Sequence, residues 1–237
     1  MSNMLMGPQN LPEQVRNIRN RIDSAARAAG RNVDSITLLA VSKAQPANMV
    51  RAAAGQGLRH FAESYVQEAL EKIEALRDLP LVWHFIGRLQ ANKTRAVASG
   101  FEWVHGVDRL KIAERLAEQR PFHAPPLNVC LQVNVAGEAS KAGVAVTELP
   151  ALARAVAALP HLKLRGLMCI APGEDDPRRQ REWFARLRRA LELLNAEGAG
   201  LDTLSMGMSS DYEAAVLEGA TIVRIGTALF GPRPAAT

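Results

Sequence analysis

The chain has 237 residues, of which 48% are hydrophobic and 22% are charged, and its formal net charge is +5 at pH 7. This composition is typical of a folded globular protein and excludes disorder and low complexity. Residues Met1 to Asn10 lack the features of a secretory signal, and no apolar run is long enough to span a bilayer. Cys130 and Cys169 lie far apart in apolar runs, so we expect reduced core residues in a cytoplasmic protein.

The chain opens with a predicted helix and then alternates between strands and helices. An apolar stripe at helical spacing runs from Val15 to Ala29, and Gly30 is suited to end that helix. The predicted strands, rich in β-forming residues, span residues 36–41, 60–62, 81–86, 102–105, 129–135, 164–170, 203–205 and 221–225. The helices predicted between them span residues 46–54, 65–77, 90–99, 109–119, 147–159, 177–196 and 211–218.

Eight strands, all but the last followed by a helix, predict an α/β protein built as a closed (β/α)8 barrel of the TIM type with an extra N-terminal helix. An open doubly wound sheet is the alternative, although no G-x-G-x-x-G motif follows the first strand. No break in composition marks a second domain. We therefore expect residues 1–237 to form one domain, with residues 1–10 flexible.

The C-terminal ends of barrel strands form the active site in proteins of this fold. Lys43 lies two residues past the first predicted strand, and Ser64, His84 and His105 follow at spacings of 21, 20 and 21 residues. Because each spacing corresponds to one βα unit, these side chains could converge on one mouth. A lysine that loses hydration there has a lowered amine pKa and becomes a nucleophile toward aldehydes. The alternative is a surface lysine on a loop.

Two turns of small residues follow the last two predicted strands, at 205–211 (SMGMSSD) and 225–228 (IGTA). Barrels often bind phosphate at this place through backbone amides and hydroxyls. Asp211 is also suited to be a helix N-cap. A lysine that traps aldehydes opposite a phosphate site suggests pyridoxal 5′-phosphate (PLP), and a Schiff-base aldolase for a phosphorylated sugar is the alternative.

Nine motifs, in order along the chain, resemble those of the pyridoxal phosphate homeostasis protein family. They are AVSK (40–43), FAESYVQE (61–68), WHFIG (83–87), LQANK (89–93), VDR (107–109), QVNVAGEASKAG (132–143), RGLM (165–168), LSMGMSSD (204–211) and VRIGTALFG (223–231). The resemblance covers residues 36–231. It implies a barrel like the N-terminal domain of alanine racemases, a bound PLP, and a non-catalytic role in intracellular vitamin B6 balance that includes supplying PLP to apo-enzymes.

The resemblance also implies which residues hold the aldehyde and the phosphate of PLP. Lys43 forms a Schiff base with the aldehyde. Ser209, Gly226 and Thr227 hold the phosphate, with help from Ser210.

Around the pyridine ring, the resemblance implies that Arg224 faces the ring nitrogen and that His84 and Met206 line the pocket. Arginine stays protonated and can only donate a hydrogen bond. The ring nitrogen then stays unprotonated, and the ring is a poor electron sink. This arrangement suits a carrier, although racemases of the same fold share it.

A few positions depart from the family pattern. Ser64 stands where the family commonly has asparagine, so an amide contact with PLP is replaced by a hydroxyl. Gln45 and Gly106 stand where lysine and serine are common. Lys141 resembles a family lysine proposed as a secondary PLP contact, and its other interpretation is a loop lysine.

The alternative function is a PLP-dependent amino-acid racemase of fold type III. Such a racemase needs a second acid or base, typically a tyrosine from a C-terminal β-domain of the partner subunit. The given chain ends six residues after Gly231, and its two tyrosines, Tyr65 and Tyr212, fall at predicted helix starts. We therefore expect a non-catalytic protein and keep racemisation as the alternative.

Other ligands and partners are not indicated. The histidines show no HxH or HExxH spacing, so we expect no metal site. The arginine-rich run at 178–189 is interpreted as the solvated face of an amphipathic helix, so we expect no nucleic acid. We expect a monomer without membrane contact that binds PLP and touches apo-enzymes transiently.

Overall fold

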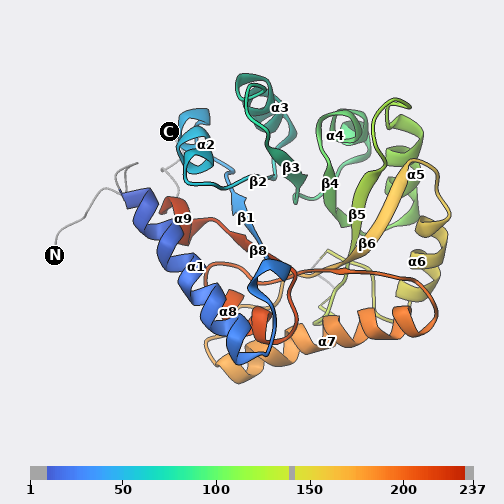
Figure 1. The fold of residues 1–237 in the computed structure, drawn as a ribbon. Coiled ribbons are helices and arrows are strands. Elements are labelled where there is room, and N and C mark those ends of the chain that lie inside the picture. The colour runs from blue at the N-terminus through green and yellow to red at the C-terminus, as the bar shows by residue number, and fades with distance from the viewer. Residues whose placement is uncertain (1–9, 139–141, 233–237) are drawn as a thin grey trace.

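Eight parallel strands form a closed barrel at the centre of the structure, and helices surround it (Figure 1). The computed structural model describes residues 10–138 and 142–232. The strands are β1 (Thr37–Val41), β2 (His60–Glu63), β3 (Val82–Phe85), β4 (Trp103–Val107), β5 (Leu127–Gln132), β6 (Leu162–Met168), β7 (Thr203–Ser205) and β8 (Ile222–Ile225). Each pairs with its sequence neighbours, and β1 pairs with β8 to close the barrel. The predicted fold class and all eight predicted strands are confirmed.

The helices lie where the sequence predicts them. They are α1 (Leu11–Ala28), α2 (Ala47–Gly55), α3 (Val66–Ala75), α4 (Thr94–Gly100), α5 (Leu110–Gln119), α6 (Leu149–Ala157), α7 (Pro177–Ala196), α8 (Tyr212–Leu217) and α9 (Thr227–Phe230), with single 3-10 turns η2 (Val33–Ser35) and η3 (Ala91–Lys93). The prediction missed the short α9 after the last strand. Strand β5 ends three residues earlier than predicted, because Val133 leaves the sheet to bridge Val144.

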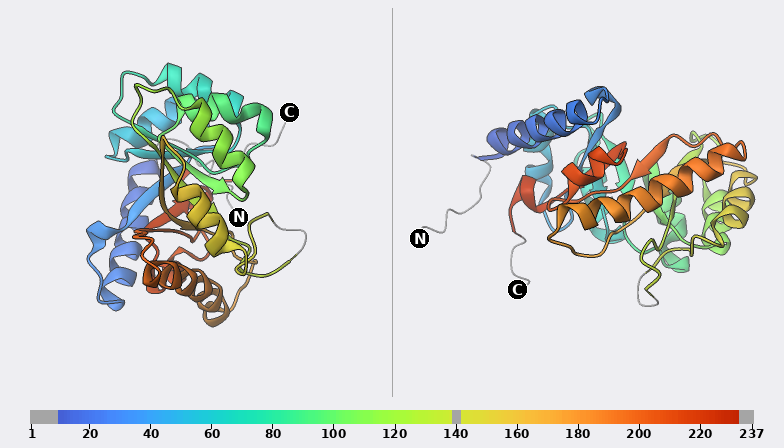
Figure 2. Two further views of the ribbon diagram at one scale, coloured as in Figure 1. Left: turned by 90° about the vertical axis from the view of Figure 1, so that its right-hand side faces the viewer. Right: turned by 90° about the horizontal axis from the view of Figure 1, so that it is seen from below.

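The extra N-terminal helix α1 packs against α8 and α9 on the outside of the barrel (Figures 1 and 2). Its buried face carries the predicted stripe, including Val15, Ile18 and Ile22. The helix ends in a Schellman motif, in which the Arg31 amide donates to the Ala26 carbonyl at 2.9 Å. Gly30 adopts the left-handed conformation that this motif requires, with φ of 66°. Of the segment predicted to be flexible, residues 1–9 lie outside the described residues, as does Lys141.

The main apolar core lies between the strands and the helices, because residues such as Ala40 and Phe61 point outward from the barrel. Inside the barrel lies a separate, much smaller apolar cluster that includes Leu39, Val41 and Ala62. Successive residues of a strand face opposite sides, so each strand contributes to both layers. Both cysteines are free and buried, as predicted.

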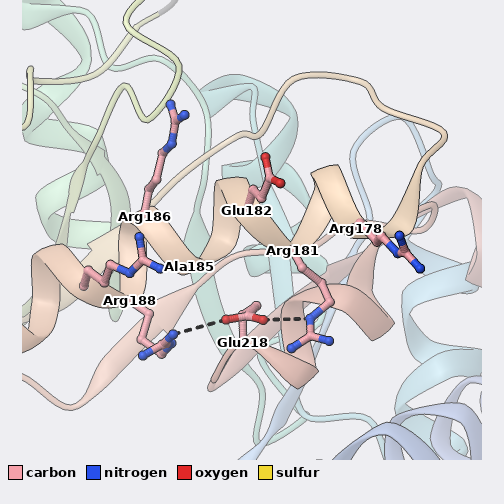
Figure 3. Close-up of a pocket in the computed structure, with 8 residues that line it drawn as sticks. Arg178, Arg181, Glu182, Ala185, Arg186, Arg188 and Glu218 are labelled. Carbon is pink, nitrogen blue, oxygen red and sulfur yellow. Dashed lines mark hydrogen bonds and ion pairs between the residues drawn. The ribbon is translucent and has the colours of Figure 1, made fainter.

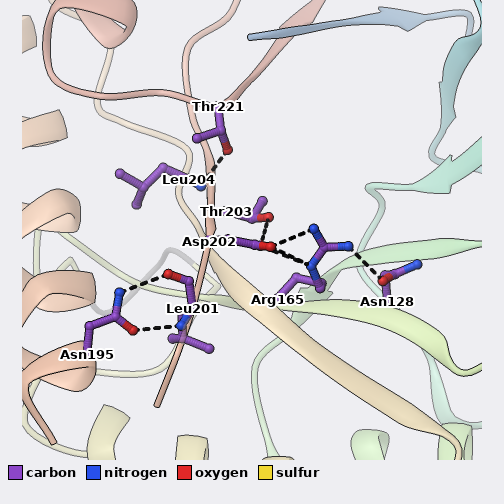
Figure 4. A network of polar contacts seen from close by, with 8 residues as sticks. All are labelled: Asn128, Arg165, Asn195, Leu201, Asp202, Thr203, Leu204 and Thr221. Atoms are coloured by element: carbon purple, nitrogen blue, oxygen red, sulfur yellow. Dashed lines mark hydrogen bonds and ion pairs between the residues drawn. The ribbon is translucent and has the colours of Figure 1, made fainter. Parts of the chain in front are cut away.

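Polar side chains tie the strands together at the N-terminal end of the barrel (Figure 4). The Arg165 guanidinium on β6 donates to the Asn128 side chain of β5 at 3.1 Å and to the Asp202 carboxylate before β7 at 2.7 and 2.9 Å. The same guanidinium lies 4.9 Å from the centre of the Trp103 ring on β4. Four neighbouring strands are therefore joined at the end opposite to the strand ends where a TIM-barrel site is expected.

Helix α7 presents its arginine-rich run to solvent, as the sequence interpretation holds (Figure 3). Arg181 and Arg188 both contact the buried Glu218 carboxylate, at 2.7 and 3.3 Å. The Arg186 guanidinium stacks 4.3 Å from the centre of the Trp183 ring. Arg179 also pairs with Glu174 at 3.6 Å, so four arginines of the run have structural partners within the protein. Among the described helices, none is both long and apolar enough to cross a membrane.

Candidate functional site

A cavity of about 610 Å³ opens at the C-terminal end of the barrel. Its wall is formed by the segments that follow β1, β3 and β7 and by the end of β8. The lining residues are Val41, Lys43, Ile86, Met208, Ser209, Ser210, Arg224, Gly226, Thr227 and Ala228. Six of the nine residues predicted for the site are among them. The volume is in the range of pockets that hold small ligands.

The loop that carries Lys43 is clamped from the outside of the barrel by Lys72 of α3. The Lys72 ammonium donates to the Ser42 carbonyl at 2.7 Å and to the carboxylates of Glu63 and Glu68 at 2.8 and 2.6 Å. Glu68 in turn accepts the Ala44 amide at 2.6 Å. Both neighbours of Lys43 in the chain are therefore fixed, and Ala44 is held at a left-handed φ of 61°.

Glu63 is the fully buried member of this clamp. Its Oε1 also accepts the Ser42 hydroxyl at 2.6 Å, whereas its Oε2 has no hydrogen-bond partner in the described part of the chain. Burial raises the pKa of the Glu63 carboxyl, and the hydrogen bonds from Lys72 and Ser42 oppose that rise. The charge of Glu63 therefore depends on Lys72 for its compensation.

The turn after β7 is shaped by Gly207 and Asp211. Gly207 has a φ of 91°, and a Cβ there would lie 2.6 Å from the Cβ of Ala215, so a side chain does not fit. The Asp211 carboxylate accepts the Met208 amide at 2.6 Å. Asp211 is the N-cap residue of α8, as predicted, but its carboxylate makes no hydrogen bond to the helix. The carboxylate is used inside the turn instead, three residues upstream.

The two small-residue turns meet at one side of the cavity. The Ala228 amide donates to the Ser209 hydroxyl at 3.2 Å, which joins the turn after β7 to the one after β8. Gly226 lies against Val41 of β1, and a Cβ there would be 3.4 Å from the Val41 Cβ. Ser210 and Thr227 complete this wall. Hydroxyls and backbone amides from both turns thus face the cavity that Lys43 also lines.

Arg224 brings a buried positive charge to the cavity floor. Its Nη1 donates to the Ser205 carbonyl at 2.6 Å and to the Ser205 hydroxyl at 2.9 Å, and its Nη2 donates to the Cys169 carbonyl at 2.8 Å. Burial lowers the pKa of the guanidinium from its ordinary value. The ordinary pKa of a guanidinium is so high that the group stays protonated and acts as a hydrogen-bond donor only. Its Nε takes no part in these three bonds.

Three predicted residues do not belong to the cavity wall. His84 points into the barrel one layer below, where its ring contacts His60 and His105, and Ile86 two residues later reaches the wall. Met206 is fully buried in the main core, because it follows the inward-facing Ser205 and so points outward. Ser64 is half-buried, and its backbone lies directly against Gly87.

Four lining residues were not singled out from the sequence: Val41, Ile86, Met208 and Ala228. The period of two along a strand offered a signal for Ile86, since it shares a face with His84. No such signal was available for Met208, because the path of the turn at Gly207 places Met208, and not Met206, at the cavity. The Glu63–Lys72 pair also carried no sequence signal, since it depends on how α3 packs on the barrel.

We expect the substitution Lys72→Met to destabilise the protein by about 3 kcal/mol at pH 8, because it leaves the buried Glu63 charge unpaired. The loss should be smaller at pH 5. A carboxyl whose folded-state pKa is raised takes up a proton on folding, so the folded state gains stability as the pH falls. Urea unfolding at the two pH values measures this difference.

The matched control is Lys111→Met, which changes an exposed lysine of α5 and should alter stability by less than about 0.5 kcal/mol. Adding Glu63→Gln to Lys72→Met should recover stability at pH 8 and remove the pH dependence of the loss. A loss that is equal at pH 5 and pH 8 would show that Glu63 is not the group left unpaired.

Comparison with known proteins identifies the family. Residues 14–234 match the family model described as alanine racemase, N-terminal domain. The chain is 60% identical over 223 residues to the pyridoxal phosphate homeostasis protein of Pseudomonas aeruginosa, covering 94% of this chain and 96% of that one. It is 50% identical over 219 residues to the protein of that name from Escherichia coli K12, covering 91% and 94%.

Solved structures agree with these matches. PipY of Synechococcus elongatus, in a structure with PLP bound, is 39% identical with a TM-score of 0.79, and the match covers 89% of this chain and 100% of that one. Its structure without PLP is 38% identical with a TM-score of 0.83, covering 93% and 100%. Alanine racemase of Corynebacterium glutamicum shares the fold at 20% identity and a TM-score of 0.66, covering 92% and 62%. The chain belongs to the alanine racemase N-terminal domain family and, within it, to the pyridoxal phosphate homeostasis proteins.

Proposed function

We propose that this protein holds PLP as a Schiff base on Lys43 and acts as a non-catalytic carrier in intracellular PLP homeostasis. The observation that supports this most directly is the composition of the cavity at the C-terminal end of the barrel. The cavity is lined by an amine, by a buried guanidinium, and by two turns that carry hydroxyls and backbone amides. These groups complement an aldehyde, a ring nitrogen and a phosphate, which are the three polar features of PLP.

The residues present fit PLP in their chemistry. Lys43 is the amine for the aldehyde. Ser209 and Thr227 offer hydroxyls to the phosphate, and Gly226 leaves room for close approach of its oxygens to the backbone. Ser210 adds a further hydroxyl. When bound, PLP supplies an electrophilic carbon and, in enzymes, an electron sink.

Arg224 is assigned to the ring nitrogen because it is a donor that cannot give up its proton. His84 and Met206, which lie behind the cavity wall, are assigned a supporting role beneath the ring rather than a direct contact. Ser64 stays assigned as a weaker contact in the place of the family's asparagine.

The relatives support a binding function. Homologues of 60% and 50% identity carry the name pyridoxal phosphate homeostasis protein, and PipY has been solved with PLP bound. We extend PLP binding and the homeostasis role to this chain on that basis.

The racemase alternative is less well supported by the cavity. The ten residues that line the cavity include two with ionisable side chains, Lys43 and Arg224. Racemisation needs a proton donor or acceptor on each face of the substrate carbon, together with a ring that withdraws electrons well. Arg224 as a donor-only partner of the ring nitrogen does not separate the two functions, because racemases of the same fold share it; the first requirement carries the comparison. We therefore favour the carrier.

We expect the purified protein mixed with PLP to show a visible absorption band that sodium borohydride removes. The reason is that a Schiff base absorbs at longer wavelength than free PLP and is reduced to an amine. Lys43→Ala should show no such band, whereas Lys111→Ala, which changes an exposed lysine, should behave as the wild type does. Mass spectrometry of the reduced protein should locate the added mass on Lys43.

A wild-type protein that takes up no PLP would overturn the proposed function and favour the sugar-phosphate aldolase. An assay for interconversion of L- and D-amino acids separates carrier from racemase. We expect no turnover above that of free PLP, and Lys43-dependent turnover would establish the racemase instead.

The phosphate assignment predicts a difference between two ligands. Ser209→Ala should weaken PLP binding about tenfold, since a hydrogen bond to a charged group contributes about 1.5 to 3 kcal/mol. It should leave the binding of pyridoxal, which lacks the phosphate, unchanged. Equilibrium dialysis measures both affinities, and Ser99→Ala on the exposed end of α4 is the matched control. Equal weakening of both ligands would contradict the assignment.

We further propose a monomer that passes PLP to apo-enzymes in transient contacts. When the loaded protein is mixed with an apo-aminotransferase and a phosphatase that destroys free PLP, the aminotransferase should regain activity. Free PLP at the same concentration should fail to restore it. If the phosphatase prevents reactivation equally by the loaded protein and by free PLP, PLP is transferred through solution and the proposal of direct transfer is wrong. Light scattering measures the molar mass in solution and so tests whether the protein is a monomer.

A further inference from the structure

The interior of the barrel holds a continuous chain of hydrogen-bonded side chains that ends at the cavity. It links His60 of β2, His84 of β3, His105 of β4, Ser205 of β7 and Arg224 of β8. His60 Nδ1 and His84 Nε2 are 3.0 Å apart, His84 Nδ1 and His105 Nε2 are 2.9 Å apart, and His105 Nδ1 and Ser205 Oγ are 2.8 Å apart. Arg224 Nη1 completes the chain at 2.9 Å from Ser205 Oγ.

Arg224 fixes the direction of the first bond in this series, because its guanidinium can only donate and Ser205 Oγ accepts from it. A hydroxyl oxygen has a second lone pair, so the directions of the other bonds follow from a tautomer assignment. We assign the Ser205 hydroxyl proton to Nδ1 of His105, which places the His105 proton on Nε2, where it is donated to His84. By the same reasoning, His84 donates to His60. In this assignment all three imidazoles are the Nε2–H tautomer, and each bond points away from the cavity.

The surroundings keep this part of the barrel uncharged. His84 is 1% exposed and His105 is fully buried. Burial lowers the pKa of His105 to about 3, with the Arg224 charge adding to the effect, and it lowers the pKa of His84 well below its ordinary value. The Trp103 ring stacks on His84 at 5.4 Å between ring centres and an interplanar angle of 12°. The hydrogen-bonded side chains are therefore neutral, apart from the one cation, the Arg224 guanidinium.

We propose that His105, supported by His84, is a positioning residue for PLP: through the Ser205 hydroxyl it holds the Arg224 guanidinium in the orientation that donates to the pyridine nitrogen. This rests on the proposed PLP-binding function. A hydroxyl that donates to His105 is a better acceptor for Arg224, because hydrogen bonds in a chain polarise one another. With Nη1 and Nη2 engaged by Ser205 and Cys169, the guanidinium plane is fixed below the cavity.

Two other roles for the histidines fit the geometry less well. A proton route from the barrel floor to the cavity would require Arg224 to release a proton, which a guanidinium does not do. A metal site needs lone pairs directed at a common point, whereas these rings direct theirs at one another. Within residues 10–138 and 142–232, no group of three or more histidine, cysteine or carboxylate side chains could hold a metal ion.

The test compares PLP with its 1-deaza analogue, which has a carbon in place of the ring nitrogen and cannot accept from Arg224. We expect His105→Leu to weaken PLP binding about tenfold, the loss of one hydrogen bond to a charged group, and to leave binding of the deaza analogue unchanged. His105→Gln should restore most of the PLP affinity, because its amide oxygen can accept from Ser205 while its nitrogen donates to His84. His123→Leu, which changes an exposed histidine outside the barrel, should bind both ligands as the wild type does.

If His105→Leu weakens the binding of both ligands equally, His105 has only a structural role. If it does not weaken PLP binding, His105 has no role in the site. Either result overturns the proposal. Urea unfolding of each variant identifies one that fails to fold. In that case the PLP-to-deaza affinity ratio of His105→Gln decides alone: a ratio close to the wild-type value supports the positioning role.

Nitrogen-15 NMR of the histidine rings tests the chain without any ligand. His84 and His105 should be neutral Nε2–H tautomers between pH 5 and pH 8. An Nδ1–H tautomer at His105, or a charged ring there, overturns the proposal. Because this measurement needs no PLP, it separates failure of the positioning role from failure of PLP binding itself.

Discussion

The pairing of β1 with β8 is the constraint on which the site depends. These strands are the first and the last of the barrel, and their register places Leu39 opposite Arg224 and Ala40 opposite Ile225. Lys43, two residues after the end of β1, and Gly226, directly after β8, therefore reach the same cavity. Closing a parallel barrel removes both sheet edges and brings the first and last strands together.

The cavity residues are held from two sides by networks of different character. Outside the barrel, the buried Glu63–Lys72 pair holds Ser42 on one side of Lys43. Glu68, which also pairs with Lys72, holds the Ala44 amide on the other side. Inside the barrel, Arg224 is a single cation whose hydrogen bonds go to carbonyls and a neutral hydroxyl. A buried charge is costly unless its donors are satisfied. The carbonyls of Ser205 and Cys169 accept these hydrogen bonds, and the Asp211 carboxylate adds a favourable electrostatic interaction.

This difference has a consequence for ligand chemistry. A guanidinium whose hydrogen bonds go to carbonyls and a hydroxyl keeps its donor character toward the cavity, and the neutral histidines behind it offer no proton to exchange. A ligand nitrogen placed against Arg224 would be hydrogen-bonded but would stay unprotonated. Such a site is suited to bind a pyridine ring firmly and to activate it weakly, which is compatible with the proposed carrier function.

The amino-acid sequence was sufficient to predict the barrel and several residues that line its cavity. Helical periodicity, short β-forming runs and their spacing identified all eight strands. Position at or after the ends of the first, seventh and eighth strands indicated Lys43, Ser209 and Arg224, which line the cavity. These features are local, since they depend on periodicity along one segment and on the rule that strand ends meet at one rim.

Which side chains face the cavity and which lie beneath it depends on the folded structure. The turn at Gly207 places Met208, and not Met206, at the cavity wall. Along β3, His84 and Ile86 share a face, but only the height of the cavity in the barrel shows that Ile86 reaches it and His84 lies below. The Glu63–Lys72 clamp and the His60–His84–His105 chain join residues from different strands and helices. Their partners are set by barrel closure and helix packing, which no single segment of sequence encodes.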